Sequence, residues 1–218
     1  MDNELTNKVL VEPKNWKNYF GLKKISLVIR MLTLVDIVVL SGLGLVTPIF
    51  AVFITQSIKG GNVEIVGIAV GVFLITKSIF QIPFGLIIDK KKGEKDDFWI
   101  MFLGYVLFSL TPLLYLLVKT PNQLYFVEFL HGIASAMALP SWYAIFTRHI
   151  DKNYEGIEWA TYNTTVSLGS AGTAFLGGFL ANKFGFDSLF VLVSIVSFSG
   201  TMFLLFTRKQ MRKGDTVK

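Results

Sequence analysis

The chain has 218 residues, of which 52% are hydrophobic and 14% aromatic, and its mean hydropathy is +0.56. This composition excludes an ordinary soluble domain and indicates an integral membrane protein. The net charge of +6 does not indicate nucleic-acid binding, because the basic residues fall between long apolar runs rather than on one amphipathic face. Cysteine is absent, which excludes disulfides, thiolate metal sites and cysteine nucleophiles.

The first thirty residues are polar and precede any apolar run. They contain Trp16, Tyr19 and Phe20 between lysines, a pattern typical of a segment that lies on the membrane surface. A disordered tail is the other interpretation. No cleavable signal peptide is predicted, so we expect the first membrane segment to direct insertion.

Six apolar segments of membrane length follow, separated by short polar turns. At ~1.5 Å per residue, about 20 helical residues cross the hydrocarbon core of a bilayer. The expected helices cover residues 32–54, 65–88, 98–118, 124–146, 159–181 and 189–206. We therefore predict an all-α membrane protein with six transmembrane helices, organised as an N-terminal segment (1–30), a helical domain (31–207) and a basic tail (208–218).

Basic residues are distributed unevenly between the two sides of these helices. Six precede the first helix, four follow the second, two follow the fourth and five lie in the tail, so 17 of the 21 lysines and arginines share one side. The opposite side carries Lys59, Lys119 and Lys183, and Lys77 lies within a segment. Because positive charge is retained in the cytoplasm, we predict that both termini are cytoplasmic.

Two segments differ in their expected surroundings. Residues 98–118 contain no charge up to Val118 and are predicted to face lipid. In residues 159–181 small side chains recur at helical spacing, which allows another helix to approach closely. That small face consists of Asn163, Ser167, Ser170, Ala174, Gly177, Gly178 and Ala181.

Four ionisable residues fall inside the apolar segments, where each costs at least a few kcal/mol and normally faces a cavity or a partner. Lys77 lies near the middle of the second segment, next to a face that includes Gln81. Glu128 and His131 are one helical turn apart in the fourth segment, so they can touch. Asp36 is expected about one turn inside the first helix, near the interface and partly wet.

The second segment ends in a glycine–aspartate pattern that runs into a basic turn, with Gly85 and Asp89 followed by Lys90-Lys91-Lys92-Gly93-Glu94. Further patterns occur in order along the chain: Gly42-Leu43-Gly44-Leu45-Val46-Thr47-Pro48, Glu128-Phe129-Leu130-His131-Gly132, and Gly169 followed by Thr173-Ala174-Phe175-Leu176-Gly177-Gly178. Together they resemble the signatures of the major facilitator superfamily. Glutamate replaces arginine in the fourth-helix signature, the antiporter signature lacks its central Gly-Pro, and the loop has one extra residue.

The resemblance spans residues 32–206 and implies a half bundle of that family, whose members have two six-helix halves related by an axis along the membrane normal. Two identical chains inserted in one orientation would reproduce this relation. The resemblance therefore predicts a parallel homodimer with its cavity at the two-fold axis. The other interpretation is a split half that needs a separate partner chain.

The resemblance also implies roles for individual residues. Substrate and proton coupling would fall to Glu128, His131, Lys77, Asp36 and Gln81, and a cytoplasmic gate to Gly85, Asp89, Gly93 and Arg148. In that gate the second helix's aspartate would accept hydrogen bonds from the fifth helix of the other protomer, with an arginine as its same-chain partner. Simpler alternatives are an ion pair between the lysine and the glutamate, an interfacial carboxylate in the first helix, and a loop that only fixes topology.

The predicted function is that of a half-size secondary active transporter of a small solute, working by alternating access in the plasma (inner) membrane, with protons as a candidate coupling ion. Its expected partners are the small-molecule substrate, the lipid bilayer and a second copy of the chain, and no nucleic acid. No phosphate-binding loop, metal cluster or catalytic triad is evident, so no cofactor, metal or enzyme activity is predicted. The alternative is a non-transporting membrane subunit.

Overall fold

The computed structural model describes residues 25–90 and 94–214, and helices are the regular structure of this part. The elements are α2 (Leu27–Val46), the 3-10 turn η1 (Thr47–Ile49), α3 (Phe50–Ser57), α4 (Val63–Lys90), α5 (Glu94–Tyr115), α6 (Pro121–Arg148) and α7 (Glu155–Gly214). Five helical runs in the described residues are long and apolar enough to cross a membrane. The all-α membrane fold predicted from composition is therefore confirmed.

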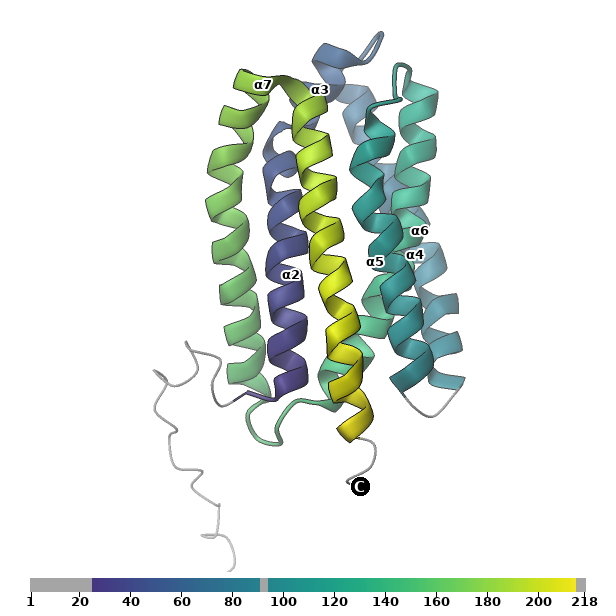
Figure 1. Cartoon of the computed structure of the whole chain (residues 1–218). Coiled ribbons are helices and arrows are strands. Elements are labelled where there is room, and N and C mark those ends of the chain that lie inside the picture. Colours follow the sequence, from purple (N-terminus) through teal and green to yellow (C-terminus); the bar gives the residue numbers. More distant parts are fainter. Residues whose placement is uncertain (1–24, 91–93, 215–218) are drawn as a thin grey trace, which may run out of the picture.

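The longest helix, α7, contains a sharp reversal. Gly185 has φ 80° and ψ 167°, values that a residue without a Cβ adopts at little cost. The two parts, residues 155–184 and 186–214, are here called the first and second legs of α7, and they run in opposite directions with α2 between them (Figure 1). Two of the expected helices are thus joined with hardly a loop between them.

The first helical run begins earlier than the hydropathy pattern predicts. It extends from Leu27 to Ser57, and Pro48 lies in the short 3-10 turn that interrupts it. Proline lacks the N–H that an α-helix interior requires, which accounts for the interruption. Asp36 consequently lies nine residues, or ~13 Å, inside the helix rather than one turn.

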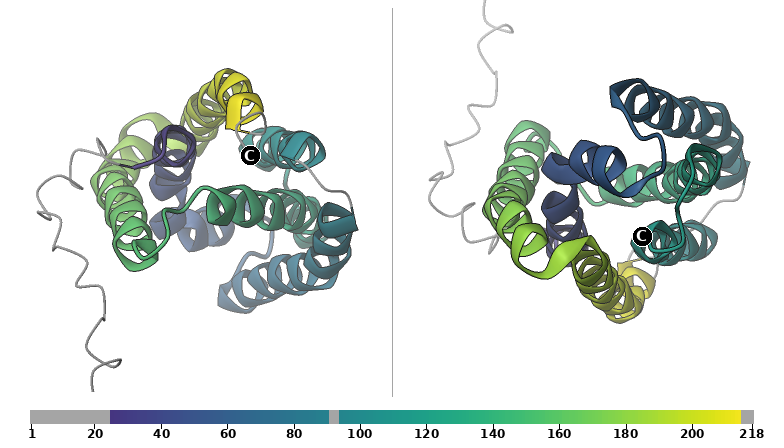
Figure 2. Two further views of the ribbon diagram at one scale, coloured as in Figure 1. Left: turned by 90° about the horizontal axis from the view of Figure 1, so that it is seen from below. Right: turned by 90° about the horizontal axis from the view of Figure 1, so that it is seen from above.

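The helices pack into two connected groups (Figure 2). Helix α2 packs against α7, while α6 packs against both α4 and α5, and α5 joins the groups by contacting α7. Helix α4 is peripheral: 11% of its most apolar stretch is buried, against 44% or more in the other four runs. It packs against α6 and touches α3.

Close approach between helices depends on small residues, as the sequence predicts for the fifth segment. A Cβ on Gly177 of the first leg of α7 would overlap the Leu45 carbonyl of α2, whereas one on Gly178 would meet nothing within 4 Å. Similarly, a Cβ on Gly104 of α5 would lie 2.7 Å from the Ala138 backbone nitrogen of α6. The predicted face of small residues is therefore present, but only part of it contacts a neighbouring helix.

Helix α5 is only partly the lipid-facing span that the uncharged stretch 98–118 suggests. It lies between α6 and α7 and buries Met101, Tyr105, Ser109 and Tyr115. Ser109 makes a hydrogen bond of 2.8 Å with Thr201 of the second leg of α7. The prediction for residues 98–118 therefore holds for one face, which exposes Trp99, Leu103 and Leu107. It fails for the other face, where uncharged polar side chains have buried partners that a hydropathy average does not register.

Candidate functional site

A carboxylate and an imidazole meet in the wall of a cavity between the helices. Glu128 on α6 is 3% exposed, and its Oε1 accepts a hydrogen bond of 2.5 Å from the Tyr115 hydroxyl of α5. Its Oε2 lies 3.5 Å from Nδ1 of His131, one turn further along α6. The predicted contact between Glu128 and His131 is thus present, and Tyr115 completes it.

Two phenylalanines flank the His131 imidazole. Its ring centroid lies 4.6 Å from that of Phe73 on α4 and 5.0 Å from that of Phe108 on α5. Neither imidazole nitrogen has a hydrogen-bond partner within the described ranges. Both nitrogens are buried, and Nδ1 faces the Glu128 carboxylate, so packing and this ion pair hold the imidazole in place.

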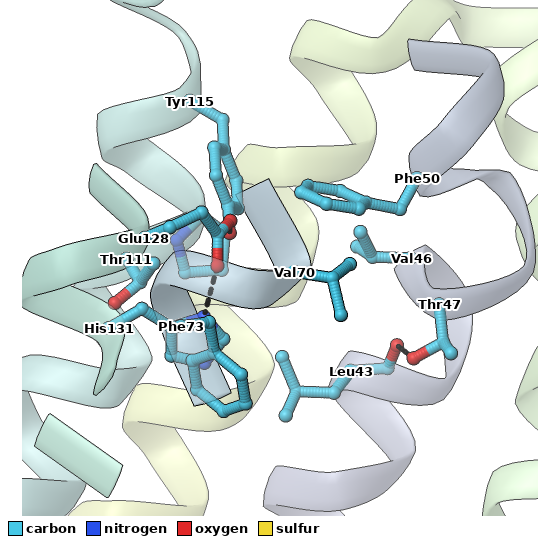
Figure 3. Close-up of a pocket in the computed structure, with 11 residues that line it drawn as sticks. Leu43, Val46, Thr47, Phe50, Val70, Phe73, Thr111, Tyr115, Glu128 and His131 are labelled. Atoms are coloured by element: carbon cyan, nitrogen blue, oxygen red, sulfur yellow. Dashed lines mark hydrogen bonds and ion pairs between the residues drawn. The ribbon is translucent and has the colours of Figure 1, made fainter. Parts of the chain in front are cut away.

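The cavity has a volume of about 310 Å³ and lies between α2, η1 and α3 on one side and α4, α5 and α6 on the other. Figure 3 shows Glu128 between Tyr115 and His131, with Phe50 and Val46 across the space from them. Thr47 and Val70, which also line the cavity, are exposed on the surface. The lining is thus largely apolar and aromatic, with Glu128 and His131 as its ionisable groups.

Lys77 lines a second cavity of about 190 Å³, together with Phe73, Tyr105, Phe108 and Ser135 among others. Its ammonium nitrogen lies 6.0 Å from the centroid of the Phe73 ring, at the outer limit of a cation–π contact. Within the described residues Lys77 forms no ion pair, so the alternative in which it pairs with Glu128 to join two helices is wrong. The two cavities share Phe73.

Gln81 follows Lys77 by one turn of α4 and lines a third hollow, of about 410 Å³, with Ser78, Pro140 and Tyr143. Trp142, beside that hollow in sequence, is 2% exposed and stacks on Phe146 at a centroid distance of 4.6 Å. The Trp142 side chain therefore packs inside the protein.

Asp36 lies in a separate cluster on α2. It is 1% exposed and accepts hydrogen bonds from the hydroxyls of Tyr105 on α5 and Tyr162 on the first leg of α7, the latter at 2.8 Å. The expectation of a partly wet, interfacial carboxylate is wrong, because the helix begins at Leu27 and tyrosines surround the side chain. Tyr105 also lines the Lys77 cavity and so connects the two.

Sequence reasoning missed three tyrosines, Tyr105, Tyr115 and Tyr162, each of which donates a hydrogen bond to a buried carboxylate. A signal was present, since a buried tyrosine hydroxyl usually finds a hydrogen-bond partner and uncompensated carboxylates are rare inside a membrane. The sequence alone does not show which tyrosine lies beside which carboxylate, because the two members of each pair come from different helices.

The structure does not bring the four residues expected to form a cytoplasmic gate together into one cluster. Asp89 is exposed at the end of α4, and a Cβ on Gly85 would meet nothing within 4 Å. Gly93 lies outside the described residues. Arg148 donates to Asp97 of α5, which corrects the expected pairing with Asp89, and His149 Nδ1 lies 3.4 Å from Glu94 Oε1.

The Arg148–Asp97 pair gives a first prediction, which concerns stability. Asp97 is fully buried, while the Arg148 side chain is 37% exposed. Arg148→Gln should lower the stability by about 1–3 kcal/mol, because it leaves a buried carboxylate short of its donor. Thermal unfolding in detergent measures this, with exposed Lys152→Gln as control, and adding Asp97→Asn should recover part of the loss. Equal unfolding midpoints for the Arg148 and Lys152 variants would contradict the prediction.

A family model described as Major Facilitator Superfamily matches residues 32–217. The chain belongs to the major facilitator superfamily. The resemblance noted from the short signatures is thereby confirmed. No group of three or more potential metal-ligating residues occurs in the part of the chain that the structure describes.

Curated relatives of this superfamily member are transporters by name. It is 27% identical over 176 residues to the uncharacterized MFS-type transporter MJ1560 of Methanocaldococcus jannaschii, covering 78% of this chain and 44% of the relative. It is 26% identical to the multi-drug resistance efflux pump PmrA of Streptococcus pneumoniae, over 70% of this chain and 38% of the pump. The proton-coupled antiporter flippase LtaA of Staphylococcus saprophyticus is 25% identical over 56% of this chain and 32% of the flippase.

The same fold occurs in a solved transporter structure. The POT family transporter PepTSo superposes with a TM-score of 0.67 at 16% sequence identity, over 84% of this chain and 38% of PepTSo. This superfamily member therefore spans less than half the length of the proteins that it matches.

Proposed function

We propose that this superfamily member forms half of a secondary active transporter that moves a small solute by alternating access, with Glu128 and His131 coupling the movement to protons. The observation that supports this is the buried carboxylate–imidazole pair in the wall of the 310 Å³ cavity. Ionisable groups inside a membrane protein are costly and mark substrate or proton paths. The proton-coupled antiporter flippase among its relatives makes protons the first coupling ion to test.

The second half, in this proposal, is another copy of the chain. The halves of this superfamily are related by an axis along the membrane normal, so a copy inserted in the same orientation has the required symmetry. Six membrane crossings, with the two legs of α7 as the last two, keep both termini on the strongly basic side. That side is cytoplasmic in our proposal, and the membrane is the plasma membrane.

Native mass spectrometry of the chain expressed alone, in nanodiscs, tests the assembly. A dimer supports the homodimeric transporter. A stable monomer contradicts it and favours the alternative, a split half or non-transporting subunit that requires a separate partner chain. Transport itself is tested in proteoliposomes that contain a pH-sensitive dye, by screening amino acids, amines, carboxylic acids and sugars for solute-driven proton movement. The absence of proton movement with all four classes contradicts proton-coupled transport of these solutes.

Asp89 has a separate role in this proposal, as a latch between protomers on the cytoplasmic side. It is exposed at the end of α4 and can reach a helix start of the other copy, whose N–H groups favour a carboxylate. The first turn of α7 already contains Glu155 and Glu158, so the latch competes with them. We expect only a modest effect for this reason.

Asp89→Asn should raise the inward-open population by roughly two- to fivefold, as a loss of about 0.3–1 kcal/mol implies. The measurement is labelling of single cysteines introduced on each side of the cavity. Asp187→Asn, an exposed aspartate at the opposite end of the helices, is the matched control. If labelling on both sides is unchanged in the Asp89 variant, Asp89 does not act as a latch.

A further inference from the structure

We infer that the transported solute is a small zwitterion with an apolar or aromatic body, whose ammonium group binds at Glu128 and whose acid group binds at Lys77. This inference rests on the proposed transport function. Its starting point is that the two opposite charges line two cavities that share Phe73 as a lining residue, and that these charges do not pair with each other.

The helices that carry the two charges are held close together. A Cβ on Gly132 of α6 would lie 2.9 Å from the Phe73 carbonyl oxygen of α4, so the two backbones are nearly in contact there. Lys77 is one helical turn from Phe73, and Glu128 is one turn from Gly132. The two charged residues therefore lie on either side of this contact, each about one helical turn from it.

Each charge lacks the partner that a zwitterion would supply. Glu128 accepts from Tyr115 and adjoins His131, and neither lysine nor arginine lines its cavity. Lys77 shares its cavity with the hydroxyl groups of Tyr105 and Ser135, and no carboxylate lines it. An ammonium group fits the first cavity and a carboxylate the second, since ion pairs strengthen where water is scarce.

The walls between the charges suit an apolar body. Phe73 lines both cavities, and its ring contacts the His131 ring at a tilt of 40°, while His131 in turn contacts Phe108. The larger cavity, at about 310 Å³, is at the lower end of the ~300–1,000 Å³ found for small-molecule sites. One small solute with an aromatic or branched apolar group fits this space.

The same pair of charges works against other solute classes. A simple organic cation that reaches Glu128 approaches the Lys77 ammonium, and a simple anion at Lys77 approaches the Glu128 carboxylate. Like charges brought together in a cavity of low polarity select against both classes. A molecule with both charges avoids each repulsion and gains both attractions.

The test uses three probes that share a phenethyl group and differ in their charges: phenylalanine, phenethylamine and 3-phenylpropionate. Binding to the purified full-length chain in nanodiscs is measured by isothermal titration calorimetry at pH 7. We expect phenylalanine to bind at least tenfold more tightly than either single-charge probe. In Lys77→Gln this preference over phenethylamine should be lost, and in Glu128→Gln the preference over 3-phenylpropionate should be lost.

Two exposed residues supply matched controls, because Lys59→Gln and Glu64→Gln remove the same charges far from the cavities and should leave the preference unchanged. Phenethylamine binding as tightly as phenylalanine, a preference that survives in Lys77→Gln, or no binding of any probe would each overturn the inference. Proteoliposome uptake separates it from the proposed function. If phenethylamine is taken up and phenylalanine is not, the zwitterion inference is contradicted and the transport function stands. If phenylalanine binds but is not taken up, the transport function is contradicted and the zwitterion site stands.

Discussion

Glu128→Gln is expected to abolish solute-driven proton movement while the protein still folds and inserts. The substituted amide keeps an oxygen that accepts the Tyr115 hydrogen bond, so packing around α5 and α6 is preserved. It cannot bind and release a proton, and it no longer attracts a positive charge. The lost charge-assisted contact is worth about 1.5–3 kcal/mol, which corresponds to a roughly 10- to 100-fold loss of solute affinity.

The measurement is the rate of proton entry into dye-loaded proteoliposomes after solute addition, together with the size-exclusion profile of the variant. Glu64→Gln is the control, since Glu64 is an exposed carboxylate at the start of α4. Proton entry at the wild-type rate in Glu128→Gln would remove this residue from the coupling mechanism. Solute exchange that persists without proton entry would show that Glu128 couples the two movements and is not required for passage.

Gly177→Ala is expected to produce the largest loss of stability, and its neighbour provides the comparison. The added methyl group would overlap the Leu45 backbone, which cannot rotate away as a side chain can, so α2 and the first leg of α7 must separate. Overpacking of this kind typically costs 1–3 kcal/mol or more. Gly178→Ala adds the same methyl group into open space, where alanine favours a helix by up to about 1 kcal/mol.

The thermal unfolding midpoints of the two variants, measured in one detergent, test this difference in stability. We expect Gly177→Ala to melt below the wild type and Gly178→Ala to melt at or above it. A common shift of both variants would show that the helices are not in contact at Leu45.

The fold was readable from the sequence because crossing a membrane demands long apolar runs that few other structures require. The ends of those runs were less readable. Ser26 and Arg30 are polar, yet the Ser26 carbonyl accepts a hydrogen bond from the Arg30 N–H as the first helix begins. A hydropathy boundary at residue 32 therefore places Asp36 too near the surface, and the error carries over to the role assigned to that carboxylate.

Of the contacts at the candidate site, the sequence could predict those within one helix but not those between helices. Glu128 and His131 are three residues apart on one helix, so local periodicity alone brings them together. The contacts of Tyr105 with Asp36 and of Arg148 with Asp97 span 69 and 51 residues. Pairings at that range depend on how helices rotate and slide against each other, which a single sequence leaves open.

The peripheral position of α4 means that the two charges proposed to hold the solute belong to parts of the molecule with different freedom. Glu128 lies on α6, which is braced by both α4 and α5, whereas Lys77 lies on a helix anchored along a single side. A solute that joins them acts as a removable crosslink between α4 and α6. Occupancy would then slow the amide hydrogen exchange of α4 more than that of any other helix, and release would return this helix to its looser state.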